Sequence, residues 1–296
     1  MPKAAIDIGS NSILLTVLGD DDSVLTDEVR IVGLGKGLGD SGMFLPDRMK
    51  AAEAVLEEYV QRAQEHGVSP YSIRAVATSA ARRSMNARTW FSRIQRKLGL
   101  RVSIITGEEE ARLTWLGALG GLNVANESCL VIDLGGGSTE LVFGRNGEVT
   151  FRTSMEVGSV RLTEKFLLEE RHQPEELARL KNHLKTELKV LDLDSTPTHV
   201  VGVAGTVTTL CATHAGLAQY EPEVVHGRPL TRDHLTDFEQ QLLGTTQSER
   251  RAMIPLAPER ADYLLAGVAI LDQVLRTARC NQLITSNGGI RYGVLQ

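Results

Sequence analysis

The sequence predicts an α/β protein built from two related domains, and three observations support this prediction. Segments with strand patterns alternate with segments of helical periodicity along the chain. A short phrase, made of an apolar run, an aspartate and a Gly/Ser turn, occurs at residues 5–12 and again at 131–140. The length of 296 residues allows two ordinary domains. We therefore expect one domain over residues 1–124 and another over 125–296, with the terminal helix packing back on the first domain.

Each copy of the phrase opens a predicted meander of three strands. In the first copy the turn leads into a strand at 13–18, and a third strand follows near 29–32. In the second copy the corresponding strands lie near 141–143 and 149–154, and Asn146-Gly147 between them is a strong hairpin signal. The repeat therefore extends beyond the glycines to a whole supersecondary unit.

The remaining elements are predicted from apolar periodicity and from Pro and Gly at their ends. Between Pro46 and Gly67, an apolar stripe with helical spacing indicates a helix. Further helices are expected at 80–98, 108–119, 159–170, 174–191, from about 207, at 232–243 and at 260–278, and further strands at 73–77, 102–105, 199–203 and 282–286. This alternation is typical of sheets covered by helices.

Composition argues against several functional classes. The net charge of −5 is unlike that of a basic nucleic-acid-binding protein, and 4% aromatic residues offer few platforms for base stacking. No apolar stretch is long enough to span a bilayer, and the first strand begins too early to leave room for a signal peptide. The three isolated cysteines lack zinc-ligand spacing. We therefore expect a cytoplasmic protein that binds neither membranes nor nucleic acid.

One segment departs from the acidic average of the chain. Residues 66–107 contain no Asp or Glu. The Lys and Arg residues of this segment are Arg74, Arg82, Arg83, Arg88, Arg93, Arg96, Lys97 and Arg101. Such a segment can offer a local landing surface to a polyanion. The alternative is an ordinary solvated helix face whose counter-charges come from elsewhere in the fold, and both interpretations stay open.

The two Gly/Ser turns have the composition of a phosphate site. Glycine lets the backbone approach an anion, and the N–H groups and hydroxyls of such a turn can hold phosphate oxygens. Asp7 and Asp133 stand at equivalent places just before the turns, where a carboxylate suits a hard divalent cation. No Lys-Ser/Thr pair follows the glycines, so neither turn is a Walker loop. The alternative for each is a plain hairpin turn.

Two further motifs each allow two interpretations. The stretch 203–209 runs from a strand through Gly205-Thr206 into a helix, which can bind an anion at the helix N-terminus or use Thr206 as a helix cap. Near the start of the helix at 108–119, Thr106 and Glu109 have capping-box spacing. One of the three acids at 108–110 could nevertheless face inward and take a proton from attacking water.

Seven motifs, in order along nearly the whole chain, resemble those of the exopolyphosphatase / guanosine pentaphosphate phosphatase (Ppx/GppA) family. They are AIDIGSNS, AVATSAARRSMN, ITGEEEARL, VIDLGGGSTEL, GVAGTVTTL, ERADYLLAGVAIL and SNGGIRYGVL. That family belongs to the actin–Hsp70–sugar kinase superfamily, so the resemblance implies two ribonuclease-H-like domains that flank a cleft. It also implies hydrolytic removal of terminal phosphate with the help of Mg²⁺, or of another divalent cation such as Mn²⁺.

The resemblance also assigns roles residue by residue. It implies that Glu110 is the catalytic base and that Arg82 is a catalytic residue that binds phosphate. It implies that the metal is held by Asp7, Asp133 and Glu110. The phosphate-binding residues that it implies are Gly9, Ser10, Asn11, Ser12, Asn86, Gly135, Gly136, Gly137, Ser138, Thr139, Glu140, Gly205 and Thr206. Arg83 is an additional positive charge beside Arg82 and is also expected to bind phosphate.

The expected reaction is therefore removal of the terminal phosphate of inorganic polyphosphate. The turns would hold the terminal phosphates, Arg82 would offset developing charge, and Glu110 would deprotonate water for in-line attack. Hydrolysis of guanosine pentaphosphate is the alternative, because its terminal anhydride is the same, although the sequence has no signature of a nucleobase pocket. A kinase of the same superfamily and a non-enzymatic nucleotide- or polyphosphate-binding protein are remoter alternatives.

Two expectations concern the polymer and the assembly. Some of the basic side chains are expected to attract polyphosphate, namely among Arg83, Arg88, Arg93, Arg96 and Lys97. Longer family members carry a C-terminal helical module after the last motif, whereas this chain stops at Gln296, so strong processivity is not expected. The resemblance further implies a homodimer.

Overall fold

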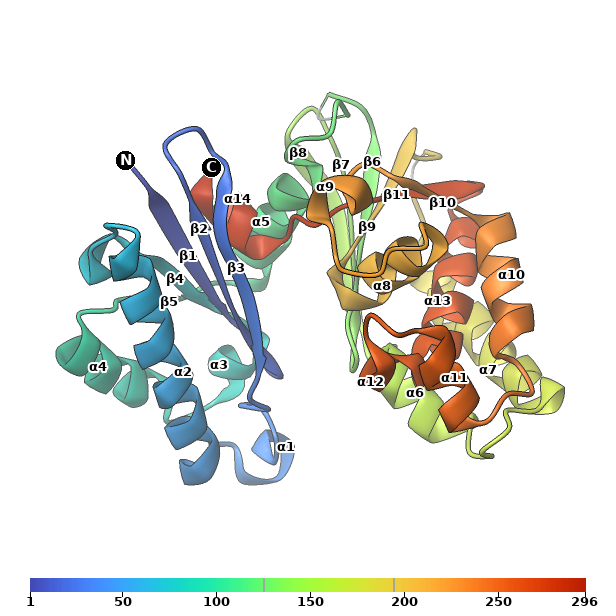
Figure 1. Ribbon diagram of the computed structural model, residues 1–296, viewed down its shortest axis with the longest axis horizontal. Coiled ribbons are helices and arrows are strands. Elements are labelled where there is room, and N and C mark those ends of the chain that lie inside the picture. The colour runs from blue at the N-terminus through green and yellow to red at the C-terminus, as the bar shows by residue number, and fades with distance from the viewer. Residues whose placement is uncertain (125, 194) are drawn as a thin grey trace. The chain divides into compact units, whose positions relative to one another are not determined.

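Two β-sheets, each with helices packed on it, make up the fold (Figure 1). The computed structural model describes residues 1–124, 126–193 and 195–296. Unit 1 comprises Met1–Gly117 together with Ile290–Gln296, and unit 2 comprises Ala118–Gly289. The mixed α/β class predicted from the sequence is confirmed.

Unit 1 begins with the first meander and continues with alternating helices and strands. Its elements are β1 (Lys3–Ile8), β2 (Ser12–Leu18), β3 (Val24–Ile31), α1 (Leu38–Ser41), α2 (Pro46–Glu65), η1 (Pro70–Ser72), β4 (Arg74–Ala77), α3 (Ser79–Arg83), α4 (Ala87–Leu98), β5 (Val102–Ile104), α5 (Gly107–Leu119) and α14 (Ile290–Leu295). Of these, α5 extends two residues past the boundary of the unit at Gly117. The sheet has the order β3-β2-β1-β4-β5, with β4 parallel to β1 and β5 parallel to β4.

The alternation of side chains along β1 sends successive residues to opposite faces of this sheet. Ile6 and Ile8 belong to a core that includes Leu56 of α2 and Trp90 of α4. Ala5 belongs to a second cluster on the other face, with Leu113 of α5 and Val294 and Leu295 of α14. Asp7 shares the parity of Ala5, so its carboxylate lies on the face covered by α5 and α14.

The terminal helix α14 packs on unit 1 through a close backbone approach. A Cβ atom at Gly293 would lie 2.0 Å from the carbonyl oxygen of Leu113, so only glycine fits there. Arg74 Nη1 donates to the carbonyl of Val294, and Gln296 Nε2 donates to that of Leu116. The domain boundary expected at residues 124 and 125 touches Ala125, which lies outside the described residues.

Unit 2 repeats the plan with a larger sheet. Its elements are β6 (Cys129–Leu134), β7 (Thr139–Arg145), β8 (Glu148–Met155), α6 (Ser159–Phe166), α7 (Pro174–Glu187), η2 (Leu188–Val190), β9 (His199–Val203), α8 (Ala204–His214), α9 (Pro222–Val225), β10 (Pro229–Thr231), α10 (Arg232–Leu242), α11 (Gln247–Met253), α12 (Pro258–Ala261), α13 (Leu264–Thr277) and β11 (Gln282–Thr285). The strand order is β10-β11-β9-β6-β7-β8.

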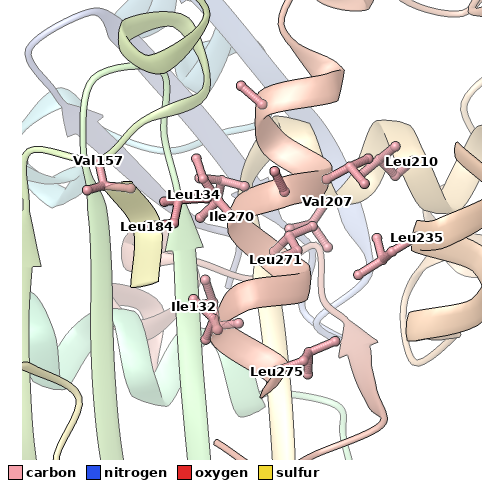
Figure 2. Close-up of a cluster of buried hydrophobic side chains, with 14 of the residues drawn as sticks. Ile132, Leu134, Val157, Leu184, Val207, Leu210, Leu235, Ile270, Leu271 and Leu275 are labelled. Carbon is pink, nitrogen blue, oxygen red and sulfur yellow. The ribbon is translucent and has the colours of Figure 1, made fainter. Parts of the chain in front are cut away.

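Helix α13 is the centre of the unit 2 core. It is apolar on nearly all sides, and 11 of its 14 residues are buried, as expected for a helix surrounded by other elements. Figure 2 shows Ile270 and Leu271 of this helix beside Leu134 of β6 and Val207 of α8. Of the residues that the structure describes, no helix is long and apolar enough to cross a membrane.

The two meanders match in their details. Asp7 pairs with Leu14 and Asp133 pairs with Glu140, each seven positions further along the chain. In both turns the N–H of the glycine two residues after the aspartate donates to a serine carbonyl at 3.0 Å. Both second strands are then interrupted ten positions after the aspartate, between Val17 and Leu18 and between Phe143 and Gly144. The predicted repeat is therefore confirmed at the level of hydrogen-bond register.

The structure differs from the expected elements at several places. The helix expected at 260–278 is divided into α12, which ends at Ala261, and α13, which begins at Leu264. The single helix expected at 80–98 is wrong, because the chain breaks between α3 and α4 at an extended Ser84. The Ser84 hydroxyl donates to Asn86 Oδ1, which also accepts the N–H of Phe44 at 2.9 Å. This tertiary contact spans 42 residues and overrides the local helical pattern. Strand β10 was not predicted, since it is a short edge strand that begins at Pro229.

Candidate functional site

An ion pair forms at the carboxyl ends of two adjacent parallel strands of unit 1. Helix α3 follows β4 and ends with Arg82 and Arg83, while α5 follows β5 and carries Glu110 in its first turn. Arg82 Nη1 donates to Glu110 Oε2 at 2.6 Å and to the carbonyl of Ile105 at 3.0 Å. The strand ends of such sheets are the usual location of ligand sites. The structure thus joins the two predicted catalytic residues directly.

The three consecutive acids of α5 have different surroundings. The N–H of Glu109 donates to Thr106 Oγ1 at 3.1 Å, and its carboxylate accepts two hydrogen bonds from Arg112. Arg112 therefore holds the pKa of Glu109 below its usual value. Glu110 instead faces Arg82. The helix-cap interpretation is confirmed for Thr106, which accepts the N–H of Glu109. Glu110 pairs with Arg82 at the strand ends, and its role as a proton acceptor stays a prediction.

Asp7, at the carboxyl end of β1, is the least compensated carboxylate of this region. Among the residues that the structure describes, no group donates a hydrogen bond to its buried Oδ1 atom. Burial raises the pKa of Asp7 to about 7; the Arg291 guanidinium opposes this shift, and the Glu110 carboxylate adds to it. A buried oxygen without a donor is costly unless a cation or a proton joins it.

The residues present fit a divalent cation of the Mg²⁺ type. Mg²⁺ is usually bound by one or two carboxylates together with waters and substrate phosphates, rather than by an all-protein cage. Asp7 supplies an unpartnered carboxylate oxygen, and Glu110 lies close enough to influence it electrostatically. The described part of the chain contains no group of three or more His, Cys, Asp or Glu side chains that could hold a metal by itself.

The first Gly/Ser turn has its carbonyl groups occupied and its N–H groups open. The carbonyl of Ser10 accepts the N–H of Gly35 at 2.7 Å. The carbonyl of Asn11 accepts the N–H groups of Val32 and Gly33. In the described ranges, neither Ser10 nor Asn11 uses its own N–H in a loop or turn hydrogen bond. Both residues are exposed, so these donors are available to an anion.

In the second turn, a helix occupies the carbonyl groups and the N–H groups again stay open. The N–H groups at the start of α6 donate to the turn carbonyls, Ser159 to Gly135 at 3.1 Å and Val160 to Gly136 at 2.9 Å. Within residues 126–193, the N–H groups of Gly136 and Gly137 make no backbone hydrogen bond outside the regular elements, and both residues are exposed. This arrangement presents successive backbone donors to solvent, as in an anion-binding nest.

Gly158, the residue before α6, makes this contact possible. A Cβ atom at position 158 would lie 2.4 Å from the carbonyl oxygen of Gly136, which is backbone and cannot rotate away. The side chain of Arg161 reinforces the same junction by donating from Nε to the carbonyl of Gly137 at 2.8 Å. The loop geometry is therefore fixed by helix α6 as well as by the glycines themselves.

The polar side chains around the second turn have two orientations. Glu140 Oε1 accepts the hydroxyls of Ser138 at 2.9 Å and Ser154 at 2.7 Å, so it orients Ser138 beside the turn. Asp133 lies at the end of β6, in register with Glu140. Thr139 is fully buried, and its hydroxyl donates to the carbonyl of Val157. The Thr139 side chain thus supports the turn from the interior.

The junction of β9 and α8 is strained and tightly covered. Ala204 has φ 72°, in the left-handed region that favours glycine, at the start of the helix. Thr206 makes no capping hydrogen bond, so its interpretation as a cap is wrong; it is buried, and its methyl group lies where a side chain at Gly267 would be. The guanidinium of Arg260 covers Gly205 and donates to its carbonyl at 3.2 Å.

Side chains of Asn86 and of the basic segment at 66–107 contact residues that are distant in the sequence. The Asn86 side chain is hydrogen-bonded to both the N–H and the carbonyl of Phe44, which gives it a structural role. Arg83 is exposed. Arg93 and Lys97 pair with Glu53 of α2 at 2.8 Å. Counter-charges from elsewhere in the fold, the alternative left open above, therefore account for part of the segment.

Two arginines near the predicted motifs were not assigned a role from the sequence. Arg260 covers Gly205, as described above. Arg291 of α14 lies 2.9 Å from Asp27 of β3, and its Nε atom is buried with no partner among the described residues. Both arginines lie in the motifs ERADYLLAGVAIL and SNGGIRYGVL. The terminal helix was expected to pack on the first domain, but the sequence does not reveal that it lies on the Asp7 face of the sheet.

Comparisons with known proteins agree with this description. Residues 19–296 match the model of the Ppx/GppA phosphatase family. Exopolyphosphatase 2 of Mycobacterium tuberculosis is 34% identical over 311 residues, which cover 98% of this chain and 96% of that protein.

Solved structures extend the comparison to the fold. A crystal structure of the Aquifex aeolicus Ppx/GppA phosphatase superposes with a TM-score of 0.89 at 34% identity, covering 100% of this chain and 98% of that one. An exopolyphosphatase from Cytophaga hutchinsonii gives 0.83 at 26% identity, covering 100% and 96%. The resemblance seen in the motifs is confirmed: the chain belongs to the Ppx/GppA phosphatase family.

Proposed function

We propose that this chain is an exopolyphosphatase, which releases orthophosphate from the end of inorganic polyphosphate by hydrolysing a phosphoanhydride bond with the help of a divalent cation. The observation that carries the proposal is the Arg82–Glu110 pair on the same strand ends as the unpartnered Asp7 carboxylate. Relatives that carry the name exopolyphosphatase support this choice of substrate. The reaction needs little covalent chemistry from the protein, because phosphoryl transfer depends mainly on positioning and electrostatics.

Glu110 is the proposed general base. Arg82 occupies its Oε2 atom at 2.6 Å, so Oε1 is the oxygen that can accept a proton from the attacking water. The second bond of Arg82, to the carbonyl of Ile105, fixes the guanidinium and thereby the orientation of the carboxylate. The same guanidinium can offset negative charge on the phosphoryl group as the anhydride bond breaks.

The metal would be held by Asp7, Glu110 and Asp133. When bound, Mg²⁺ or Mn²⁺ would neutralise charge on the phosphate oxygens. The Asp7 Oδ1 atom is suited to this role because it is buried and has no hydrogen-bond partner among the described residues. In each unit, the open N–H groups of the Gly/Ser turn would bind phosphate oxygens.

Phosphate release by the purified chain tests the proposal. Long-chain polyphosphate, tripolyphosphate and guanosine pentaphosphate are each offered with Mg²⁺ and again with excess chelator. We expect release from both polyphosphates and its loss with chelator. Faster release from guanosine pentaphosphate than from polyphosphate would favour the pentaphosphatase alternative. Binding of these anions without any release, or transfer of the phosphate to a second molecule, would contradict hydrolysis.

A further inference from the structure

Helix α4 carries two sets of basic side chains that differ in their partners. Arg93 Nη2 and Lys97 Nζ each lie 2.8 Å from a carboxylate oxygen of Glu53, and Lys97 also pairs with Glu57. Both acids belong to α2. This pair of cations is therefore neutralised within the protein.

Arg88 and Arg96 form the other set. Both are exposed, and within the described residues neither has an ion pair or a side-chain hydrogen bond. The segment 66–107 around them contains no acid at all. Unpaired arginines without a nearby acid in the sequence keep their full charge available to an external anion.

Helix geometry explains this division. The buried residues Trp90, Phe91 and Ile94 define the face of α4 that packs into the core of unit 1. Residues five positions apart on a helix are about 140° apart around its axis, so Arg88 and Arg93 lie on opposite flanks. The flank with Arg93 faces the acids of α2, whereas Arg96 points outward between the two flanks.

The unpaired arginines of α4 follow closely in the sequence after the candidate site residue Arg82. Helix α3 ends with Arg82, which binds Glu110, and with Arg83, which is exposed. Helix α4 begins four residues after Arg83 and has 12 residues, so it is roughly 18 Å long. Helices α3 and α4 are in contact within unit 1. Positive charge thus extends from the strand ends along one helix.

We propose that Arg88 and Arg96, continuing from Arg83, bind the trailing phosphates of a polyphosphate chain whose terminal phosphate lies at Arg82. This inference rests on the proposed function for the identity of the polyanion. The surface would act on polymers that extend several phosphates beyond the terminal one, and not on short substrates. It would therefore set chain-length preference separately from catalysis.

Two matched variants on the same helix test the proposal. R88Q/R96Q removes the unpaired charges, and R93Q/K97Q removes the neutralised ones; each lowers the net charge by two. Binding of polyphosphate of about 100 units and of tripolyphosphate is measured by calorimetry at 50 and 200 mM salt, and the Michaelis constant is measured for both substrates. Calorimetry is done in excess chelator, where no hydrolysis is expected, so it reports binding alone.

For R88Q/R96Q we expect about tenfold weaker binding of the long polymer at low salt, since an exposed charge pair contributes a factor of about three. Its loss of affinity between the two salt concentrations should be roughly sevenfold smaller than for the wild type, as expected for two fewer contacts to a single-stranded polyanion. Tripolyphosphate binding and turnover should not change, and R93Q/K97Q should resemble the wild type.

The proposal is overturned if both double variants weaken long-chain binding equally, because the effect would then be one of net charge. It is also overturned if R88Q/R96Q weakens binding of tripolyphosphate as much as binding of the polymer. Absence of phosphate release by the wild type would contradict the proposed function alone, since the polymer-binding comparison would still decide the role of α4.

Discussion

The two Gly/Ser turns, one in each unit, use the same arrangement of backbone hydrogen bonds. In both, hydrogen bonds from elsewhere occupy the turn carbonyls and leave N–H groups exposed. In unit 1 the donors come from the loop at residues 32–35, and the strand ends beside the turn carry Asp7, Arg82 and Glu110. In unit 2 the donors come from helix α6. Under the proposed function, unit 1 would supply the reacting charges, and unit 2 would supply phosphate-binding N–H groups on a turn that a helix supports.

The largest expected effect concerns the acids of α5. Replacing Glu110 by Gln should lower kcat by about 10²–10⁴-fold, the usual contribution of a general base, while the fold is retained. Replacing its neighbour Glu109 by Gln should leave kcat nearly unchanged, because that carboxylate is paired with Arg112. Steady-state phosphate release measures both. Equal losses in the two variants would show that the helix terminus matters, and not the base.

The next effect concerns the support of the unit 2 turn. Gly158→Ala should destabilise the protein by about 1–3 kcal/mol, since its Cβ atom would lie 2.4 Å from a backbone carbonyl oxygen. The corresponding variant in unit 1, Gly35→Ala, meets Ser10 at 3.2 Å and should cost less. Thermal unfolding compares them. A larger loss for Gly35→Ala would contradict the view that the helix-supported turn is the more rigid one.

A gain in stability is expected where unit 1 carries an uncompensated charge. Asp7→Asn removes the negative charge of a carboxylate whose buried Oδ1 atom has no donor among the described residues. In excess chelator at pH 8, the variant should be more stable than the wild type by about 1–3 kcal/mol. In separate samples without chelator, its binding of Mn²⁺, followed by electron paramagnetic resonance, should be weaker than that of the wild type. A less stable variant would mean that the Asp7 carboxylate already has a stabilising partner in the protein alone.

The smallest expected effect is a pH dependence of the free energy of unfolding, which arises from a histidine of unit 2. His172 is buried, and burial lowers its pKa; Arg250 beside it acts in the same direction, while Glu176 and Asp262 oppose it. The unfolded chain therefore binds a proton that the folded chain resists, so the free energy of unfolding should fall as pH decreases below about 6.5.

His172→Gln should flatten this decline between pH 7 and pH 5. The matched control is His66→Gln in unit 1, where the imidazole contacts Thr26 Oγ1 at 2.9 Å near the surface. Urea unfolding at each pH provides the free energies. If His66→Gln flattens the profile more than His172→Gln, the pH dependence does not arise from the buried imidazole of unit 2.

The fold was predictable where local pattern and tertiary structure agree. The meanders, their turns and the strands at β4 and β9 could be located because apolar runs and Gly or Asn-Gly turns act over a few residues. The break between α3 and α4 could not, because it depends on Asn86 binding Phe44. The central position of α13 was also not apparent from periodicity, since a fully buried helix has no polar face.

The identity of the candidate site residues could be predicted from the sequence better than the contacts that those residues make. Sequence reasoning placed Arg82 and Glu110 in one site, but their direct ion pair depends on the parallel order of β4 and β5. The role of α6 in holding Gly136 depends on Gly158, which lies outside the quoted motifs. Long-range backbone contacts of this kind leave little local trace in a single sequence.

The division of labour between the turns is tested most directly by steady-state kinetics of the wild type, E110Q and G158A on polyphosphate. We predict that E110Q lowers kcat and leaves the Michaelis constant nearly unchanged, because it removes the base and keeps the phosphate donors. G158A should raise the Michaelis constant and retain most of kcat, because it disturbs the cradle. A wild-type kcat for E110Q, or a loss confined to kcat for G158A, would contradict this account.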